Sequence, residues 1–177
     1  DGLAHAAADL GIDYAHAQWD APDLDSQICE FAPDLLFVVH GRNFARRYPS
    51  INAFGCPTAV WLLDEPYEVD DTETFSHRFD RVFISDPATL HRHTNASYLP
   101  VCYDRHVHKP GPHPRIRKVG FIGGGNSTRE RYLSALARAG VLDYVVGGDW
   151  GDEAIRSVCI GRNVRPVITA DLYGVTK

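Results

Sequence analysis

An apolar run that stops at three consecutive glycines constrains the fold of this 177-residue chain more than any other feature. The run spans residues 119–122, Gly123–Gly125 follow directly, and a helix-like segment covers residues 129–139. Three residues favoured as helix N-caps stand between the glycines and that segment: Asn126, Ser127 and Thr128. A strand, a glycine turn and a helix in this order are typical of one unit of a parallel α/β sheet.

The glycine turn is also a candidate anion site. Glycine lets the backbone approach a ligand closely, and the free N–H groups and dipole of a first helical turn attract negative charge. Arg129 and Arg131 add guanidinium donors suited to pyrophosphate. The spacing of Gly123–Gly125 matches neither the dinucleotide-binding pattern G-x-G-x-x-G nor the P-loop. We therefore expect either a nucleotide diphosphate site outside those two classes or an ordinary turn that binds nothing.

Strand-like and helix-like segments alternate along the whole chain, which predicts an α/β fold with parallel sheets. Leu35–Val39 is a continuous apolar run, typical of a strand covered on both faces. The expected strands are residues 12–18, 35–39, 57–63, 81–84, 97–99, 119–122 and 142–146. The expected helices are residues 2–10, 24–31, 44–54, 71–79, 87–93, 129–139 and 153–158, with Gly11 and Gly55 ending the first and third.

A proline-rich segment divides this pattern in two. Residues 106–117 contain three prolines and a glycine, cannot continue a helix, and are typical of an interdomain linker. The sequence thus predicts two Rossmann-like parallel-sheet units: an N-terminal domain over residues 1–105 and the first part of a second domain over residues 118–177. The chain has no methionine, even at position 1, and opens like the inside of a helix. We therefore expect a fragment of a longer polypeptide.

The bulk composition excludes several classes of protein. Its 44% apolar and 23% charged residues are those of a soluble globular protein. A net charge of −5 argues against a nucleic-acid binder, because neutralising phosphates requires a basic excess. No apolar run approaches the roughly 20 residues of a transmembrane segment. The four cysteines are far apart and lack a C-x-x-C pair, which is typical of reduced thiols. These features predict a cytoplasmic protein.

Candidate site residues follow the ends of the expected strands, because ligands of open parallel sheets bind beyond the carboxyl ends of the strands. In the N-terminal unit these positions hold His40, Arg42, Asp64, Glu65 and Asp86. Each also has a structural interpretation: a backbone contact for the histidine, turn formation for Asp64 and Glu65, and helix capping for Asp86. In the second unit Trp150 is either a core residue or a platform beside a nucleotide base.

The sequence contains two closely spaced pairs of histidines, but it favours neither pair as a metal site. His91 and His93 fall in an expected helix, where residues two apart diverge. His106 and His108 lie in the linker with only Asp104 nearby. We therefore expect no metal site. No arrangement of a nucleophile with a base stands out either, and the G-x-S-x-G pattern is absent.

Several short motifs occur in order along both halves of the chain. In the first half they are Pro33-Asp34 before the apolar run 35–39, Pro57-Thr-Ala-Val-Trp-Leu-Leu-Asp-Glu-Pro66, Phe79-Asp-Arg-Val-Phe83 and Tyr98-Leu-Pro-Val-Cys-Tyr-Asp104. In the second half they are Val119-Gly-Phe-Ile-Gly123 with Arg129 and Arg131, and then Gly147 to Trp150. Together they resemble the GT-B glycosyltransferases of the CgeB, or spore maturation protein, type. Glu65 stands where that family has an aspartate.

The resemblance implies transfer of a sugar from a nucleotide diphosphate sugar to an acceptor held by the N-terminal domain, whether glycan, protein or small molecule. It places the donor at Gly123, Gly124, Gly125, Asn126, Arg129 and Arg131, with its base near Trp150 and Val167. Arg42, Glu65 and Asp86 would contact the acceptor, and either Asp64 or His40 would be the general base. Enzymes of this type need no cofactor and no essential metal.

Two other functions fit the same features. One is a non-catalytic sugar-nucleotide-binding or scaffold module that keeps the fold, and the other is a sugar-nucleotide epimerase of the same architecture. The part of the family's donor domain that would follow Lys177 is missing, including the acidic residue that holds the donor. On this interpretation the fragment could be inactive alone.

Overall fold

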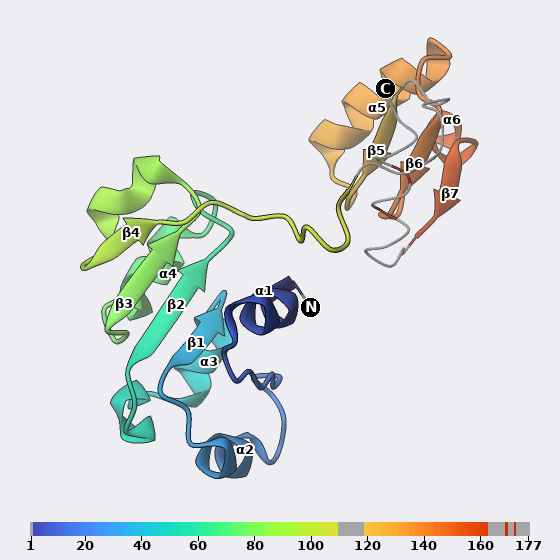
Figure 1. Cartoon of the computed structure of the whole chain (residues 1–177). Helices are drawn as coiled ribbons and strands as arrows, with labels where there is room; N and C mark the ends of the chain where they lie inside the picture. Colours follow the sequence, from blue (N-terminus) through green and yellow to red (C-terminus); the bar gives the residue numbers. More distant parts are fainter. Residues whose placement is uncertain (1, 110–118, 163–168, 170–171, 173–177) are drawn as a thin grey trace. The chain divides into compact units, whose positions relative to one another are not determined.

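A computed structural model describes residues 2–109, 119–162, 169 and 172 (Figure 1). The chain divides into two compact units, residues 1–102 and 103–177. Each unit contains one sheet of parallel strands, with four described strands in the first unit and three in the second. The expected α/β fold with two parallel sheets is therefore confirmed. Most of the expected linker lies outside the described residues.

The four strands of the first unit lie side by side in chain order: β1 (Leu36–Val39), β2 (Thr58–Leu62), β3 (Arg81–Ile84) and β4 (Ala96–Tyr98). Helix α3 (Arg42–Arg47) and the 3-10 helix η1 (Ile51–Phe54) connect β1 to β2. Helix α4 (Val69–Ser76) connects β2 to β3, and the 3-10 helix η2 (Pro87–Arg92) connects β3 to β4. This order brings the carboxyl ends of β1 and β2 together at one edge of the sheet.

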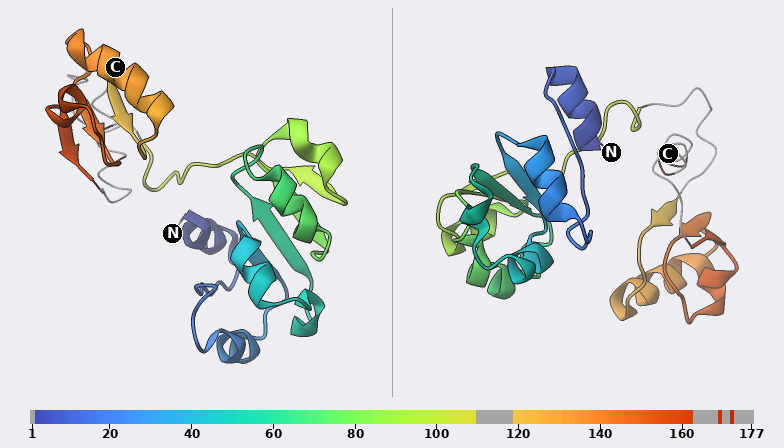
Figure 2. Two further views of the ribbon diagram at one scale, coloured as in Figure 1. Left: turned by 180° about the vertical axis from the view of Figure 1, so that it is seen from behind. Right: turned by 90° about the horizontal axis from the view of Figure 1, so that it is seen from below.

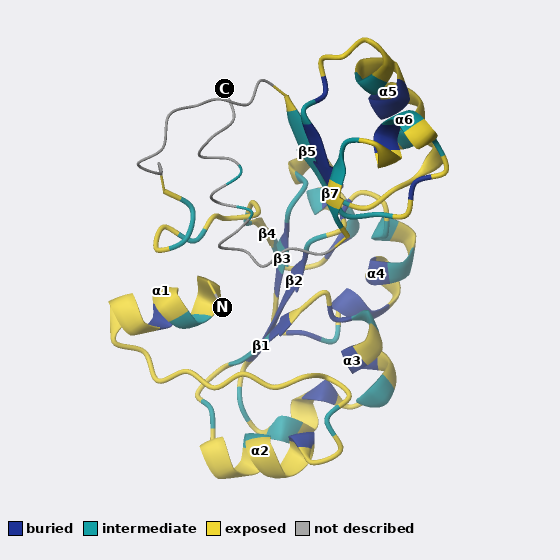
Figure 3. Ribbon diagram, turned by 90° about the vertical axis from the view of Figure 1, so that its right-hand side faces the viewer, coloured by how far each residue is buried: buried dark blue, intermediate teal, exposed yellow. Residues whose placement is uncertain are grey.

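The core of the first unit lies between one face of this sheet and helices α3 and α4 (Figure 2). Successive strand residues point to opposite faces, so alternate positions share the inner face. Those inner positions are Val38, Val60, Leu62, Val82 and Ile84. Phe44 of α3 and Phe75 of α4 pack against them. Figure 3 shows the buried residues concentrated on the strands and on the inward faces of these helices.

The opposite face of the first sheet carries a row of aromatic side chains. The ring centroid of Phe37 lies 6.3 Å from that of Trp61 and 6.4 Å from that of Phe83. The Trp61 indole N–H also donates a 3.0 Å hydrogen bond to the carbonyl of Leu99. Leu99 N donates in turn to the carbonyl of Ile84, at the end of β3. The segment that follows β4 is thus fastened to the middle of the sheet.

Helices α1 (Gly2–Leu10) and α2 (Leu24–Phe31) form where the sequence predicts them, but the strand predicted at residues 12–18 does not form. Ile12 and Tyr14, which alternate with polar residues, remain 57% and 42% exposed. No described strand pairs with this segment. Strand propensity is realised only when neighbouring strands and packing support it, and here both are missing.

Two predicted helices differ in type or continuity, and the helices predicted at residues 71–79, 129–139 and 153–158 form at Val69–Ser76, Ser127–Arg138 and Glu153–Arg156. The helix predicted at residues 44–54 is interrupted, because Pro49 disfavours helical geometry at the preceding residue. Tyr48 accordingly has φ −119° and ψ 83°, and a separate 3-10 helix follows. The segment from Pro87 is also a 3-10 helix rather than an α-helix.

The second unit contains the sheet β5-β6-β7, with bounds Gly120–Ile122, Tyr144–Val146 and Cys159–Gly161. Helix α5 (Ser127–Arg138) follows β5, and α6 (Glu153–Arg156) lies between β6 and β7. Its core comprises Leu133, Leu142, Val145, Trp150 and Ile155. The sequence pattern did not predict β7, a three-residue strand that ends in glycine.

Two aspartates join elements within their units through side-chain hydrogen bonds, of which three are partly buried and one is exposed. Asp80 Oδ2 accepts from the amide and the hydroxyl of Thr58, at 2.8 and 2.9 Å, and these bonds lower the pKa of Asp80. Asp152 Oδ2 accepts from the Ser134 hydroxyl and from Arg138, both at 2.7 Å. The hydroxyl of Ser134 is the main cause of the lowered pKa of Asp152. Each carboxylate therefore stabilises its unit in the ionised form.

Among the described residues, no helix has the length and apolar character needed to cross a bilayer.

Candidate functional site

One candidate site lies where β1 and β2 end. His40 follows β1 directly, and Asp64 follows β2 after one intervening residue. His40 Nδ1 lies 3.1 Å from Asp64 Oδ2. The two side chains are 51% and 56% exposed, so the pair is open to a ligand from solvent. Adjacent parallel strands thus bring together two residues that the sequence predicted only as separate alternatives.

The backbone at His40 explains how its ring reaches Asp64. His40 has φ 68° and Gly41 has φ 79°, so both adopt the left-handed conformation. This conformation is uncommon for a residue other than glycine, and such strained residues cluster at functional sites. A Cβ on Gly41 would lie 2.7 Å from a methyl of Val60, which leaves no room for any other residue there. The His40 amide also donates to the carbonyl of Trp61, at 2.9 Å.

The pair has the arrangement of a general base and its orienting carboxylate. The contact has ion-pair distance without hydrogen-bond geometry, and because an ionised carboxylate can only accept, a hydrogen bond between the two groups requires the proton on His40 Nδ1. The other ring nitrogen, Nε2, is then unprotonated and can take a proton from a bound hydroxyl. Asp64 would also stabilise the imidazolium that results. The geometry therefore favours His40 as the base and Asp64 as its partner.

Arg42 is engaged within the protein. Its guanidinium contacts the carboxylates of Asp71 and Glu68, the latter at 3.0 Å. The hydrogen bond to Asp71 is the main cause of the raised pKa of Arg42. These two ion pairs join α3 to α4 and to the loop before α4. In this arrangement the charge of Arg42 is balanced by the protein itself, and an acceptor would have to compete with two carboxylates.

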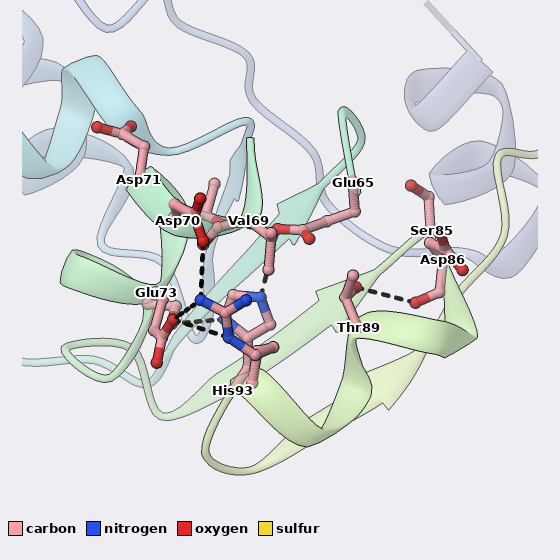
Figure 4. Close-up of polar contacts among 12 residues, drawn as sticks. Glu65, Val69, Asp70, Asp71, Glu73, Ser85, Asp86, Thr89 and His93 are labelled. Carbon is pink, nitrogen blue, oxygen red and sulfur yellow. Dashed lines mark hydrogen bonds and ion pairs between the residues drawn. The ribbon is translucent and has the colours of Figure 1, made fainter. Parts of the chain in front are cut away.

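Glu65 and Asp86 also make structural contacts. The Glu65 side chain has no exposed surface, and its Oε1 accepts from the Thr72 hydroxyl at 2.5 Å (Figure 4). Asp86 Oδ1 accepts from the amide of Ala88 at 2.9 Å and so caps η2, which was the structural interpretation of this residue. Among the side chains predicted on the acceptor side, His40 and Asp64 are the pair that meets at an open surface.

A second candidate site lies where β5 ends, in the other unit. The Gly123 amide donates to the carbonyl of Val146 at 2.9 Å, which joins the end of β5 to β6. Asn126 Oδ1 accepts from the Arg129 amide at 2.9 Å and caps α5, so the first of the three N-cap candidates in the sequence is the one used. Among the described residues, no group accepts a hydrogen bond from the amides of Gly124 and Gly125. Both glycines are exposed residues, and the backbone of Gly148 packs against the amide nitrogen of Gly125.

The next glycine turn packs against the first one through backbone atoms alone. Gly147 and Gly148 follow β6 with φ of 89° and 75°. A Cβ on Gly147 would lie 2.7 Å from the carbonyl oxygen of Gly123, and one on Gly148 would lie 2.6 Å from the amide nitrogen of Gly125. Only glycine combines the left-handed conformation with such a close approach. The edge of this sheet is therefore a surface of main-chain atoms.

The two arginines near this turn have different positions. Arg129 Nη1 donates to the carbonyl of Gly124 at 2.8 Å, and its guanidinium lies 5.8 Å from the ring centroid of Phe121. Arg131 lies one residue further than the first helical turn and contacts Tyr132, with its guanidinium 5.0 Å from that ring. Arg129 is thus the cationic side chain that the fold places on the glycine turn.

Trp150 is a core residue. It is 7% exposed, and its indole N–H donates to the carbonyl of Gly147 at 2.6 Å. Its ring meets Phe121 edge-on, with 5.9 Å between the centroids and 79° between the planes. In this position the Trp150 ring supports both glycine turns. This favours the interpretation of Trp150 as a core residue over its interpretation as a platform beside a nucleotide base. Val167, also predicted on the donor side, lies outside the described residues.

Sequence reasoning did not identify the side chains that hold the two edges in place. Thr72 and Ser76 of α4 are buried, as is His93, which was considered only as a metal ligand. Two polar residues four apart on the inward face of a helix were the available signal, because buried hydroxyls require partners. Their partners come from distant segments, which the sequence alone does not reveal.

In the part of the chain that the structure describes, no group of three or more His, Cys, Asp or Glu side chains is placed to hold a metal ion. A scan against protein-family models and a search of curated proteins find no match for the sequence. Function is therefore argued from the geometry of the two edges.

Proposed function

We propose that this chain is part of a GT-B glycosyltransferase, which moves a sugar from a nucleotide diphosphate to a hydroxyl-bearing acceptor. The observation that carries the proposal is the glycine turn before α5. There, the exposed residues Gly124 and Gly125, whose amides have no acceptor among the described residues, lie beside the guanidinium of Arg129. The resemblance of the motifs along the chain to CgeB-type enzymes supports the same assignment.

The second unit would bind the donor. When the bond between the sugar C1 and the diphosphate oxygen breaks, negative charge grows on the diphosphate. Main-chain N–H groups and the positive end of α5 stabilise that charge without reorganising, because the fold fixes them in advance. Arg129 can exchange its neutral carbonyl acceptor for a phosphate oxygen, and charge-assisted bonds of this kind are about twice as strong as neutral ones. The proposal invokes no cofactor.

The first unit would bind the acceptor. His40 Nε2 takes the proton of an acceptor hydroxyl while that oxygen forms the new bond to the sugar C1. The nucleoside diphosphate leaves with the electron pair of the broken bond. Asp64 keeps the proton of the imidazole on Nδ1 and stabilises the imidazolium. The acceptor is a glycan, a protein or a small molecule that presents a hydroxyl group.

Calorimetric titration of the chain with UDP, GDP, dTDP and ADP tests the donor half of this proposal. At least one nucleoside diphosphate should bind, and Arg129→Ala should weaken it by about 1–3 kcal/mol, the range for losing a hydrogen bond to a charged group. Arg131→Ala is the matched control and should lose less, because Arg131 contacts Tyr132 beyond the first helical turn.

A second variant separates binding from folding. Asn126→Asp keeps a side chain that caps helices equally well, but it adds a negative charge beside the expected diphosphate. The melting temperature should hold while the nucleotide affinity falls. If no diphosphate binds the chain, or if Arg129→Ala leaves the affinity unchanged, the anion site is wrong and the scaffold alternative gains. Interconversion of free UDP-N-acetylglucosamine without any acceptor would instead identify an epimerase.

A further inference from the structure

A chain of buried polar side chains runs behind the His40–Asp64 pair. Glu65 and His93 both have side chains with no exposed surface, and their Oε1 and Nε2 atoms lie 3.3 Å apart. His93 Nδ1 lies 2.9 Å from the Ser76 hydroxyl. Glu65 Oε1 also accepts from the Thr72 hydroxyl (Figure 4). Because the Ser76 oxygen is itself buried, this chain cannot deliver a nucleophile to an external substrate, and its role must be internal.

This buried chain connects three separate elements. Glu65 belongs to the loop after β2, Thr72 and Ser76 belong to α4, and His93 follows η2. The loop passes directly into α4, since the Glu68 amide donates to the carbonyl of Asp64 at 3.2 Å. Glu65 is therefore the inward-facing anchor of the same loop whose preceding residue, Asp64, faces the solvent and His40.

The anchor involves two buried ionisable groups. Glu65 Oε2 has no hydrogen-bond partner in the described structure, and the contact of His93 Nε2 with Oε1 has ion-pair distance without hydrogen-bond geometry. Removing one partner of a buried pair leaves the other unsatisfied, which is strongly unfavourable. The nearby charges are already committed: Arg92 pairs with Asp70 and Glu73, and Arg42 with Glu68 and Asp71.

We infer that Glu65 and His93 are positioning residues, which hold the loop so that the Asp64 carboxylate stays within contact distance of His40 Nδ1. Asp64 itself is half exposed and has no other described partner, so its direction depends on the backbone of this loop. The course of that backbone depends in turn on Glu65, the next residue, whose side chain is buried. The inference rests on the proposed function only where it treats His40 as the base; the tautomer of His40 can be measured without any substrate.

The test is the protonation pattern of the His40 ring in the 177-residue chain, read from its two ¹⁵N chemical shifts. A His40→Gln variant assigns those signals among the nine histidines. The wild-type chain at neutral pH should show mainly the form with the proton on Nδ1. Asp64→Ala removes the carboxylate and provides the reference for a ring that exchanges between both forms.

Glu65→Ala should move the His40 shifts most of the way to the Asp64→Ala reference, although Asp64 is still present. Glu65→Gln, which can still accept from Thr72 but has no charge to pair with His93, should restore part of the wild-type pattern. Thr72→Val keeps the shape but removes one bond, so it should cause a smaller change in the same direction; it also provides a test if Glu65→Ala does not fold. Thr89→Val is the matched control, because this buried hydroxyl bonds only to the carbonyl of Asp86.

The results separate this inference from the proposed function. His40 shifts that stay at the wild-type values in both Glu65→Ala and Thr72→Val would overturn the positioning role. So would a change of equal size in Thr89→Val, since that would reflect a general loss of packing. A chain that shows the expected ¹⁵N pattern but binds no nucleoside diphosphate would overturn the glycosyltransferase proposal and leave the positioning role intact.

Discussion

The two sheets of this protein present different chemical groups at the edge where their strands end. In the first unit the edge presents ionisable side chains, His40 and Asp64, on a backbone that adopts a strained conformation to carry them. In the second unit the edge presents main-chain amides and carbonyls from two glycine turns that pack directly on each other. The first edge suits proton transfer, for which a group must gain and lose charge. The second suits the binding of a constant negative charge.

This difference also determines how each edge can be altered. A side-chain site can lose its chemistry through a substitution that leaves the fold intact. A main-chain site has no side chain to remove, so a substitution reaches it through packing or through neighbouring charge. The comparison therefore predicts that chemistry and stability separate readily for substitutions of His40 and Asp64, and hardly at all for substitutions of the glycines themselves in the second unit.

The largest expected effect is on catalysis in the first unit. His40→Gln should lower the rate of the proposed sugar transfer by about 10²–10⁴-fold, the usual contribution of a general base. Its thermal unfolding should change little, because the ring is half exposed. The measurement is the transfer rate at saturating donor beside a melting curve. A variant that unfolds together with its loss of rate would remove the contrast between the two edges.

The next effect is on the stability of the second unit. Gly147→Ala should cost about 2–5 kcal/mol, the sum of about 1–2 kcal/mol for a left-handed alanine and about 1–3 kcal/mol for overpacking against Gly123. Gly140→Ala is the matched control: Gly140 has φ 68°, but nothing lies within 4 Å of the added Cβ, so it should lose the conformational part alone. Urea unfolding, followed by the ¹⁹F signal of fluorotryptophan at Trp150, measures both. Equal costs would show that the close approach of the turns is unimportant.

The smallest effect is the response of the second unit to acid. Because the pKa of Asp152 is lowered by folding, the unfolded chain takes up this proton first as the pH falls. The stability from Asp152 is therefore complete above its unfolded pKa of about 4 and is lost as the pH falls through the lower, folded value. Asp152→Asn should flatten the pH dependence of the Trp150 unfolding signal between pH 5 and 3. Asp80→Asn removes the corresponding carboxylate of the first unit and should leave that signal's pH dependence unchanged.

The elements that the sequence predicted best are those whose local pattern agrees with their packing. Helix α2 and strand β3 have the bounds expected from apolar periodicity, and the N-cap of α5 at Asn126 follows directly from its residue type. The segment at residues 12–18 failed because its alternation was local and found no neighbouring strand. Strand β7 was missed for the opposite reason, since pairing with β6 creates a strand that its residues hardly indicate.

The candidate sites were predictable in position but not in geometry. The rule that ligands bind beyond strand ends located His40, Asp64 and the glycine turns. It could not show that His40 adopts a positive φ and so meets Asp64, because asparagine, aspartate or glycine would be the usual residue there. It also placed Glu65 on the surface beside Asp64, whereas the loop turns that side chain inward to His93. Pairings between distant segments depend on tertiary structure.

The hydrogen bond from the Trp61 indole to the carbonyl of Leu99 has a practical consequence for dissecting the protein. This bond holds the segment that ends the first unit against the sheet. A stop codon placed just after Cys102 would therefore leave the bond intact. A truncated gene ending there should give a protein fit for crystallisation trials and for screening acceptor candidates separately from nucleotides. Trp61→Phe would remove this hydrogen bond to the segment after β4 while leaving an aromatic ring in the sheet.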